Sequence, residues 1–364
     1  MSHEFNHVRD LLDELVSLVN SGQGISDIHL EQDLPLMIKT PRGWRQAGAA
    51  PVTLADMAPV LGAIDKDWEL KIVDRAIDRP FALPDYRLRC HVYRSSGGAM
   101  VTVSIRCLPA RPIPLAQIGL PQYAWTMLEA TRGVIVVTGP TGSGKTTTIA
   151  SMLDHINATR SAHIVTIEEP IEYRLQRKQS IISQKEVPTD TATFSSGLRE
   201  ALRQNPDVLM VGEIRDFDTA DTVLYAGDAG HLVLATMHTT SAVGALARLL
   251  DFFPADQRDR RAAGLARSLV GVIFQSLVPN ERGDALVLAH EILFNHNQQL
   301  ARYIADPGKV HQIEDVLRRR EDTMSRSLND VLAQLVAQKI IAARDAMRAA
   351  YNRLELHDML GRMR

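Results

Sequence analysis

Residues 133–147 read Gly-Val-Ile-Val-Val-Thr-Gly-Pro-Thr-Gly-Ser-Gly-Lys-Thr-Thr, and this stretch decides the fold. Its first six residues form an apolar, β-branched run that is typical of a strand buried on both faces. The following eight fit the pattern G-x-x-x-x-G-K-[ST], in which glycines let backbone N–H groups curve around phosphate oxygens. A helical pattern over residues 147–156 completes the strand, loop and helix of a phosphate-binding loop. Its residues are Gly139, Pro140, Thr141, Gly142, Ser143, Gly144, Lys145 and Thr146, with Thr147 at the start of the helix.

The loop predicts a site for ATP and Mg²⁺. Lys145 is expected to contact the β- and γ-phosphates, and the hydroxyl of Thr146 is expected to bind the metal. The amino end of the helix adds a dipole that favours the negative charge of the phosphates.

Beyond the loop, apolar runs alternate with amphipathic helical segments, and this predicts an α/β fold with a parallel sheet covered by helices. Residues 257–278 and 325–350 are predicted as further helices. The strands are expected at 134–138, 164–167, 208–211 and 232–236.

The preceding residues predict a smaller mixed α/β domain. Three prolines between Pro109 and Pro114 indicate a stiff linker. We therefore expect one domain over 1–107, a linker over 108–116, and an ATPase domain with C-terminal helices over 117–364. Within the first domain, helices are expected at 5–19, 54–64 and 67–73, and strands at 26–30, 36–39, 86–93 and 100–107.

Acidic residues follow two predicted strands of the larger domain. Glu213 lies just past the carboxyl end of the strand 208–211, where open α/β sheets bind ligands, and is the candidate to orient the attacking water. Asp207, at the other end of this strand, is expected to be structural. Residues 166–172 pack three carboxylates into a strand end and turn, which indicates either a solvated acidic loop or a site near a cation. Within it, Glu168 is the candidate for catalysis and for the metal.

Two histidines, His231 and His238, flank the strand 232–236 at opposite ends. A lone histidine is most often a satisfied polar residue. His238, however, falls at the carboxyl end of its strand, where its ring could contact the γ-phosphate and sense hydrolysis.

Composition excludes several classes of protein. The net charge of −2 and the aromatic content of 5% argue against a nucleic-acid partner. Cys90 and Cys107 are the only cysteines, so a four-cysteine zinc module is excluded, and both are expected to be buried thiols in a reducing compartment. Apolar runs fall far short of the ~20 residues that a membrane helix needs. We expect a cytoplasmic protein that reaches a membrane through a partner.

Four segments together resemble the secretion ATPase superfamily of type II secretion and type IV pilus systems, and within it the pilus retraction ATPases. The resemblance extends from residues 26–30 to the C-terminal helices. The family's Walker A, Asp box, Walker B and His box correspond to residues 139–146, 166–173, 207–213 and 231–238.

The resemblance implies a PAS-like N-terminal domain, a RecA-like ATPase domain and a Mg²⁺-dependent motor. It implies a homo-hexamer at the cytoplasmic face of the inner membrane, with a membrane platform protein as partner and pilin acted on indirectly. ATP would lie between the two domains. Arginines of the N-terminal domain would reach its phosphates, and Arg89, Arg94 and Arg106 are the candidates by position.

Two positions depart from the family pattern. Glu169 stands where the family usually has aspartate, and of the Ala-Ile-Arg-Asn-Leu motif of retraction ATPases the stretch 300–304 keeps only Arg302. The short N-terminal region and the lack of a four-cysteine module favour retraction. The alternatives are an ATPase of type IV secretion or conjugation, a pilus assembly ATPase, a nucleic-acid translocase and a non-enzymatic regulatory ring.

Overall fold

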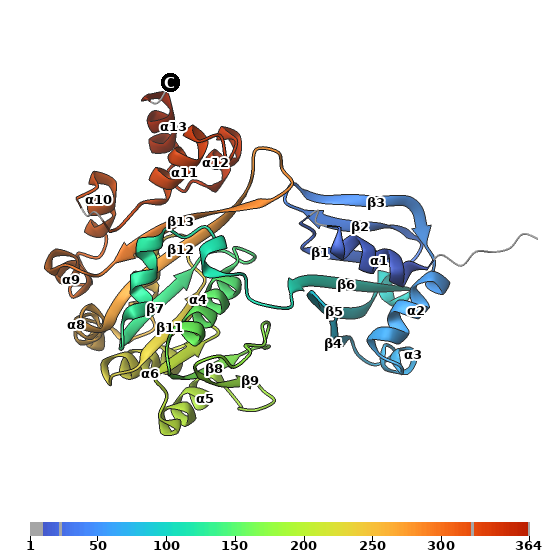
Figure 1. The fold of residues 1–364 in the computed structure, drawn as a ribbon, viewed down its shortest axis with the longest axis horizontal. Helices are drawn as coiled ribbons and strands as arrows, with labels where there is room; N and C mark the ends of the chain where they lie inside the picture. The colour runs from blue at the N-terminus through green and yellow to red at the C-terminus, as the bar shows by residue number, and fades with distance from the viewer. Residues whose placement is uncertain (1–9, 22–23, 322–323, 363–364) are drawn as a thin grey trace, which may run out of the picture. The chain divides into compact units, whose positions relative to one another are not determined.

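The computed structural model describes residues 10–21, 24–321 and 324–362 (Figure 1). The chain divides into two compact units. The first comprises residues 1–111 together with 282–286, and the second comprises residues 112–281 together with 287–364.

The first unit is built on an antiparallel sheet of six strands in the order β3-β2-β1-β6-β5-β4. Helices pack on the apolar face of this sheet, because Leu11 and Leu15 join Met57 and Leu61 in one core with the inward strand residues. The elements are α1 (Leu11–Asn20), β1 (Asp27–Glu31), β2 (Leu34–Thr40), β3 (Gly43–Val52), α2 (Leu54–Ile64), α3 (Trp68–Lys71), β4 (Ile77–Ala82), β5 (Tyr86–Ser95) and β6 (Met100–Pro109).

Strict alternation positions the side chains of β5 and β6. Leu88, Cys90 and Val92 point into the core, so the residues between them face outward. Both cysteines are buried free thiols, as the sequence predicts, and burial raises the pKa of each to about 12.

Most of the elements predicted for this unit are present, and two strands were missed. The predicted helix 5–19 appears as α1, and its residues 5–9 lie outside the described residues. The missed strands, β3 and β4, are the two edges of the sheet. β3 is largely exposed and lacks an alternating pattern, while β4 contains Pro80, which edge strands tolerate.

The second unit contains a seven-stranded sheet in the order β13-β12-β7-β11-β10-β8-β9. The central strands pair in parallel, as predicted. The strands are β7 (Gly133–Thr138), β8 (His163–Glu168), β9 (Ile181–Glu186), β10 (Val208–Val211), β11 (Leu232–Met237), β12 (Leu269–Pro279) and β13 (Leu286–Phe294).

Helices cover both faces of this sheet. Val134 and Val136 of β7 pack with the helices of one face, whereas Ile135 and Val137 pack with α4 and the 3₁₀ segment Gln122–Glu129 on the other. The first group of helices is α5 (Phe194–Ala201), α6 (Phe217–Asp228), α7 (Ala242–Asp251) and α8 (Arg258–Ser268), and α4 is Lys145–Thr159.

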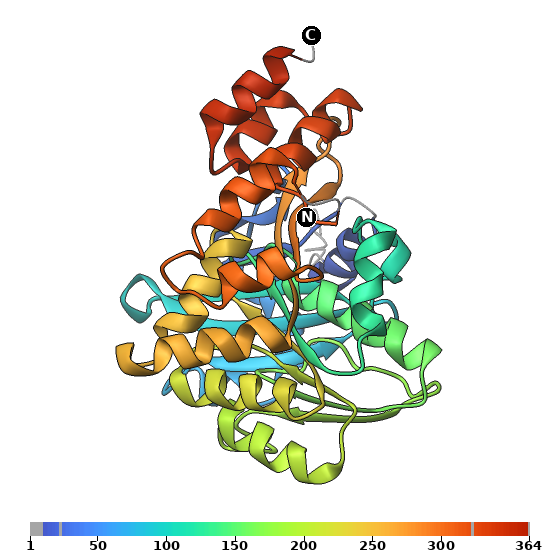
Figure 2. The ribbon, with the colours of Figure 1, turned by 90° about the vertical axis from the view of Figure 1, so that its left-hand side faces the viewer.

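Among the described residues, five further helices follow β13, and α11 to α13 form a cluster at one end of the unit, drawn in red in Figure 2. They are α9 (Gln298–Ile304), α10 (Gln312–Arg319), α11 (Leu328–Ala337), α12 (Ala343–Ala349) and α13 (Arg353–Arg362).

The prediction of helices over 257–278 was wrong in its second half. α8 ends at Ser268, and residues 269–279 form β12, which pairs with β7. A continuous apolar run has no period that separates a buried strand from a buried helix, so this pairing was invisible in the sequence.

Candidate functional site

The phosphate-binding loop connects β7 to α4 and depends on glycine at three positions. Gly139, Gly142 and Gly144 all have positive φ, with values of 149°, 79° and 85°. A Cβ at Gly139 would also collide with the carbonyl oxygen of Gln275. Only glycine therefore fits here, and the loop lies in close contact with strand β12.

Lys145 is held inside this loop. Its Nζ donates to the carbonyl oxygens of Gly139 and Pro140 at 2.9 and 3.0 Å, and its side chain is buried. Burial lowers the pKa of Lys145, and the charges of Glu213 and Glu172 oppose this shift. The ammonium group of Lys145 therefore lies inside the loop, where it can contact a bound anion.

Gln275 of β12 holds the phosphate-binding loop through a hydrogen bond, and this role was not predicted from the sequence. Its Nε2 donates to the carbonyl of Ser143 at 2.6 Å, and the residue is fully buried. This bond turns one carbonyl of the loop toward the sheet, leaving backbone N–H groups for the phosphates. Because residues 269–278 were predicted as helix, nothing in the sequence placed Gln275 beside the loop.

Glu213 and His238 come together at the carboxyl ends of β10 and β11. His238 Nδ1 lies 3.3 Å from Nζ of Lys145, and its Nε2 lies 3.6 Å from Oε1 of Glu213. Neighbouring strand ends are fixed by Thr236, whose hydroxyl donates to the carbonyl of Gly212. Three residues that were predicted separately therefore form one continuous row of charged and polar groups.

Arg215 is a second residue that sequence reasoning left without a role. Its Nε donates to Oε2 of Glu213 at 2.8 Å, and its Nη1 contacts Oε2 of Glu169 at 3.0 Å. Glu169 is the position where the family usually has aspartate. The glutamate side chain of Glu169, one methylene longer than aspartate, contacts Arg215, which also contacts Glu213. Arg215 therefore links the acidic segment 166–172 to Glu213.

Glu168 ends β8 as a buried carboxylate. Oε1 accepts hydrogen bonds from Thr166 Oγ1 at 2.7 Å and from Gln184 Nε2 at 3.0 Å, and burial raises the pKa of the group. Glu168 and Thr146 line one small cavity. The carboxylate and the hydroxyl are oxygen donors of the kind that Mg²⁺ prefers.

A metal at this cavity would need donors beyond the protein. Within the described ranges, no three His, Cys, Asp or Glu side chains converge on a possible metal site. Thr147, the last residue predicted for the nucleotide, shares a hydrogen bond of 2.9 Å with the hydroxyl of Tyr173.

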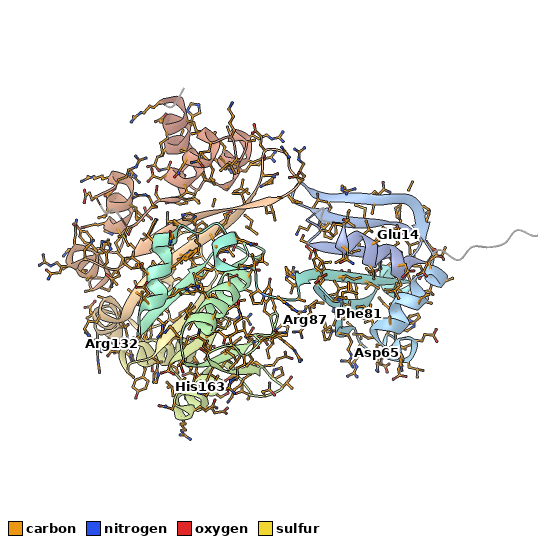
Figure 3. All side chains as sticks on the ribbon, in the orientation of Figure 1. Glu14, Asp65, Phe81, Arg87, Arg132 and His163 are labelled. Carbon is orange, nitrogen blue, oxygen red and sulfur yellow. The ribbon has the colours of Figure 1, made fainter. Side chains whose placement is uncertain are left out.

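The remaining polar candidates of this unit lie at the amino end of the strands. Asp207 accepts from the backbone N–H of His163, the residue labelled in Figure 3, at 2.7 Å. His231 Nδ1 contacts the carbonyl of Pro206 at 2.8 Å. Asp207 is thus structural, as predicted, and His231 is a satisfied polar residue.

The three candidate arginines are exposed residues of the first unit. Arg89 and Arg106 are direct cross-strand partners on β5 and β6 and share the outward face. Arg106 also contacts Asp27 at 3.2 Å. Arg94 has the opposite parity on β5 and donates to the carbonyl of Gly98 at 3.1 Å. The structure therefore separates Arg94 from the other two.

Comparison with known proteins gives the family and two similar relatives. The model of the family described as type II/IV secretion system protein matches residues 86–302. The twitching motility protein of Neisseria gonorrhoeae is 35% identical over 319 residues, which cover 87% of this chain and 84% of the relative. The type IV pilus retraction ATPase PilT of Pseudomonas aeruginosa is 34% identical over 331 residues, covering 90% and 95%.

Solved structures share the architecture. A crystal structure of the pilus retraction motor PilT with bound ADP matches with a TM-score of 0.79 and 35% identity, over 98% of this chain and 100% of that one. The Legionella pneumophila ATPase DotB matches with a TM-score of 0.85 over 96% of both chains, and at 24% identity this is a likeness of fold alone.

Proposed function

The chain belongs to the type II/IV secretion system protein family, and from this membership we propose that it hydrolyses ATP to drive retraction of a type IV pilus. One observation carries the proposal. Nζ of Lys145, at the start of α4, lies 3.3 Å from Nδ1 of His238, and Nε2 of His238 lies 3.6 Å from Oε1 of Glu213, so the three side chains form a row.

The binding step is proposed to use the loop and the first turn of α4. Backbone N–H groups between Gly139 and Thr146 would bind phosphate oxygens, and Lys145 would exchange its two carbonyl contacts for the β- and γ-phosphates. The hydroxyl of Thr146, which lines the same cavity as Glu168, would hold Mg²⁺, and the ion would supply positive charge against the phosphates.

The hydrolytic step is proposed to use Glu213. Its carboxylate would orient a water and accept its proton as the water oxygen bonds to the γ-phosphorus and the bond to the β–γ bridging oxygen breaks, which releases ADP and phosphate. Arg215 holds Oε2 of Glu213, which leaves Oε1 on the side of His238. His238 would donate to a γ-phosphate oxygen and register its departure.

Arg89 and Arg106 are proposed to contribute positive charge to the same reaction. Their cross-strand pairing places two guanidinium groups side by side on the outward face, one of them already paired with Asp27, and a phosphate could bind both groups. The proposed assembly is a homo-hexamer with a platform protein in the inner membrane, at its cytoplasmic face, acting on pilin through that partner. In the described part of the chain, no helix has the length and apolarity to cross a bilayer.

The enzymatic proposal is tested with the purified full chain. We expect ATP hydrolysis that requires Mg²⁺, stops on chelation, and is lost in Lys145→Ala. The matched control is Lys178→Ala, which removes the same charge from an exposed ion pair with Asp154. A wild-type chain that releases no phosphate from ATP under these conditions would overturn the proposal.

The direction of the motor is tested by deleting the gene in its bacterium. Retraction predicts cells with excess surface pili and no twitching motility, restored by the wild-type gene and not by the Lys145→Ala gene. Cells without pili would instead mean an assembly motor, and unchanged pili with lost substrate export would mean a secretion motor.

A further inference from the structure

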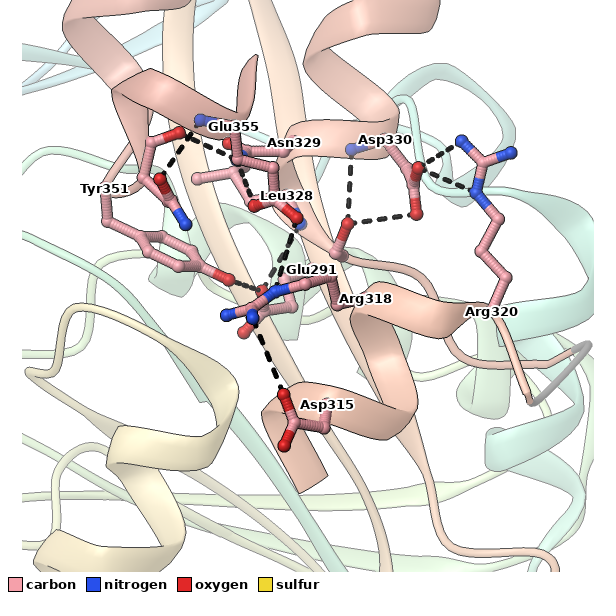
Figure 4. A network of polar contacts seen from close by, with 11 residues as sticks. Glu291, Asp315, Arg318, Arg320, Leu328, Asn329, Asp330, Tyr351 and Glu355 are labelled. Atoms are coloured by element: carbon pink, nitrogen blue, oxygen red, sulfur yellow. Dashed lines mark hydrogen bonds and ion pairs between the residues drawn. The ribbon is translucent and has the colours of Figure 1, made fainter. Parts of the chain in front are cut away.

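A buried glutamate lies where the helix that follows His238 meets the C-terminal helices (Figure 4). Glu291 of β13 has no exposed surface. Its Oε1 accepts from the backbone N–H of Ala242 at 2.8 Å. Its Oε2 accepts from the backbone N–H of Leu328 at 3.3 Å and from the hydroxyl of Tyr351 at 2.7 Å.

The location of these donors explains how the core tolerates a carboxylate. Ala242 and Leu328 are the first residues of α7 and α11, so one carboxylate faces the amino ends of two helices. Helix amino ends present unpaired N–H groups and a favourable dipole to an anion. Removing one donor would leave the buried group incompletely satisfied, which is costly. The three groups are therefore held as one unit.

On one side of Glu291, the chain leads directly to the candidate site. Ala242 is four residues after His238, and the residues between them are fixed by short contacts. Thr239 Oγ1 donates to the carbonyl of Ser241 at 2.9 Å and shares a hydrogen bond of 2.7 Å with Thr138 at the end of β7. A displacement of the first turn of α7 would therefore reach the imidazole through a short, constrained segment.

On the other side, Glu291 contacts a separately braced group of helices. Asn329 of α11 donates to the carbonyl of Asn352 and to Glu355 of α13, at 2.9 and 2.7 Å. Tyr351 lies in the short connection between α12 and α13. A cavity of about 530 Å³ separates the two sides, lined by Thr240 and Ser241 on one and by Tyr351 and Asn352 on the other. The bonds of Glu291 to Ala242 and Tyr351 join the two sides beside this cavity, together with one apolar core that contains residues of α7 and α11.

We propose that Glu291 is a positioning residue for the reaction, which ties the amino end of α7, and through it His238, to the C-terminal helices by way of Tyr351. This inference rests on the proposed ATPase function. It assigns the C-terminal helices a part in hydrolysis.

The test uses two variants and one matched control in the full chain. Tyr351→Phe removes a single hydroxyl from Glu291. Glu291→Gln keeps an acceptor for Ala242 and loses the second carboxylate oxygen. The control, Asn329→Ala, loosens α11 from α13 and leaves every bond of Glu291 in place. Two readouts are compared: hydrogen exchange of the peptide 237–245 without nucleotide, and steady-state ATP hydrolysis.

We expect both variants to exchange faster than wild type over 237–245, and the control to match wild type there. We expect kcat to fall about threefold in Tyr351→Phe and about tenfold in Glu291→Gln, with KM for ATP changed less than about twofold. In a His238→Ala background, Tyr351→Phe should lower kcat no further, because the residue through which it acts is absent.

Three results would overturn the inference: unchanged exchange in Tyr351→Phe, equal effects of Asn329→Ala and Tyr351→Phe on kcat, or a full effect of Tyr351→Phe without His238. An inactive wild-type chain would overturn the proposed function instead. The exchange readout would still report whether Glu291 positions the segment, so the two failures are distinguishable.

Discussion

Polar side chains at the two ends of the parallel strands β10 and β11 have different kinds of partner. At the amino ends Asp207 and His231 bond to the backbone, whereas at the carboxyl ends Glu213 and His238 contact other charged side chains. Asp207 accepts from a backbone N–H, and His231 contacts a backbone carbonyl. Glu213 faces Arg215 and His238. Asp207 and His231 are fixed by these bonds to neighbouring strands, whereas Lys145 bonds to carbonyls of the phosphate-binding loop that a phosphate could replace. Side chains that contact one another can exchange partners with a substrate, and this difference separates structural groups from chemical ones.

The largest expected effect comes from comparing one acid at each end of β10. Glu213→Gln should lower kcat by roughly 100-fold or more and leave the melting temperature nearly unchanged. Asp207→Asn should keep kcat within about twofold and lower the free energy of unfolding by about 1 kcal/mol or less, because an exposed backbone donor exchanges a charged acceptor for a neutral one. ATPase assays and thermal unfolding of both variants make the comparison, and an inactive but stable Asp207→Asn would break it.

The arginines of the first unit show the same difference between a side chain bonded to backbone and side chains that lie against each other. Arg94 donates to a backbone carbonyl, whereas Arg89 and Arg106 face each other on the outward side of the sheet. We expect Arg89→Gln or Arg106→Gln to lower kcat by roughly 100-fold, and Arg94→Gln to stay within a few-fold of wild type. A larger loss in Arg94→Gln than in either of the other two would show that backbone bonding does not separate the roles.

Gln275 tests whether a side chain that bonds to backbone can still affect catalysis. It donates to the carbonyl of Ser143 in the phosphate-binding loop, which follows the carboxyl end of β7. Gln275→Leu removes the donor to Ser143 and should raise KM for ATP by about tenfold with a smaller change in kcat, since the loop is misplaced before chemistry begins. Gln179→Leu removes a similar bond to a backbone carbonyl on the surface and serves as the control. A fall in kcat at constant KM would contradict this positioning role.

The smallest expected effect concerns stability and pH at Glu168. Burial raises the pKa of Glu168 in the folded chain above its ordinary value of 4.5. Between these two pKa values the folded state retains a proton that the unfolded state has lost, so its contribution to stability falls as pH rises. Glu168→Gln lacks this loss and should melt above wild type near pH 8, and the difference should disappear toward pH 4.

Thermal unfolding at several pH values without nucleotide measures this difference. The same variant should lose ATPase activity, so stability and activity are expected to change in opposite directions. A constant difference in melting temperature across the pH range would mean that Glu168 does not titrate in this window.

The sequence predicts those parts of the site that depend on local order. The phosphate-binding loop is one continuous segment, and Glu213 and His238 each follow an apolar run whose carboxyl end faces the ligand. Their mutual distances follow from the parallel order of β7, β11 and β10.

What the sequence does not predict depends on pairings between distant segments. Gln275 reaches Ser143 across 132 positions, through a strand whose apolar run resembles a buried helix. Arg215 meets Glu169 across 46 positions. Glu291 is an isolated acid within an apolar strand, and its role emerges only when two helix amino ends converge on it.

The burial of Cys90 and Cys107 has a practical consequence for spectroscopy. The chain has no other cysteine, and with a pKa of about 12 neither thiol forms an appreciable thiolate at neutral pH. In the folded protein these two thiols should therefore react very slowly with thiol-directed dyes. One new cysteine in each compact unit would accept a donor and an acceptor fluorophore without first removing natural residues. Energy transfer between the dyes could then follow the distance between the units during turnover.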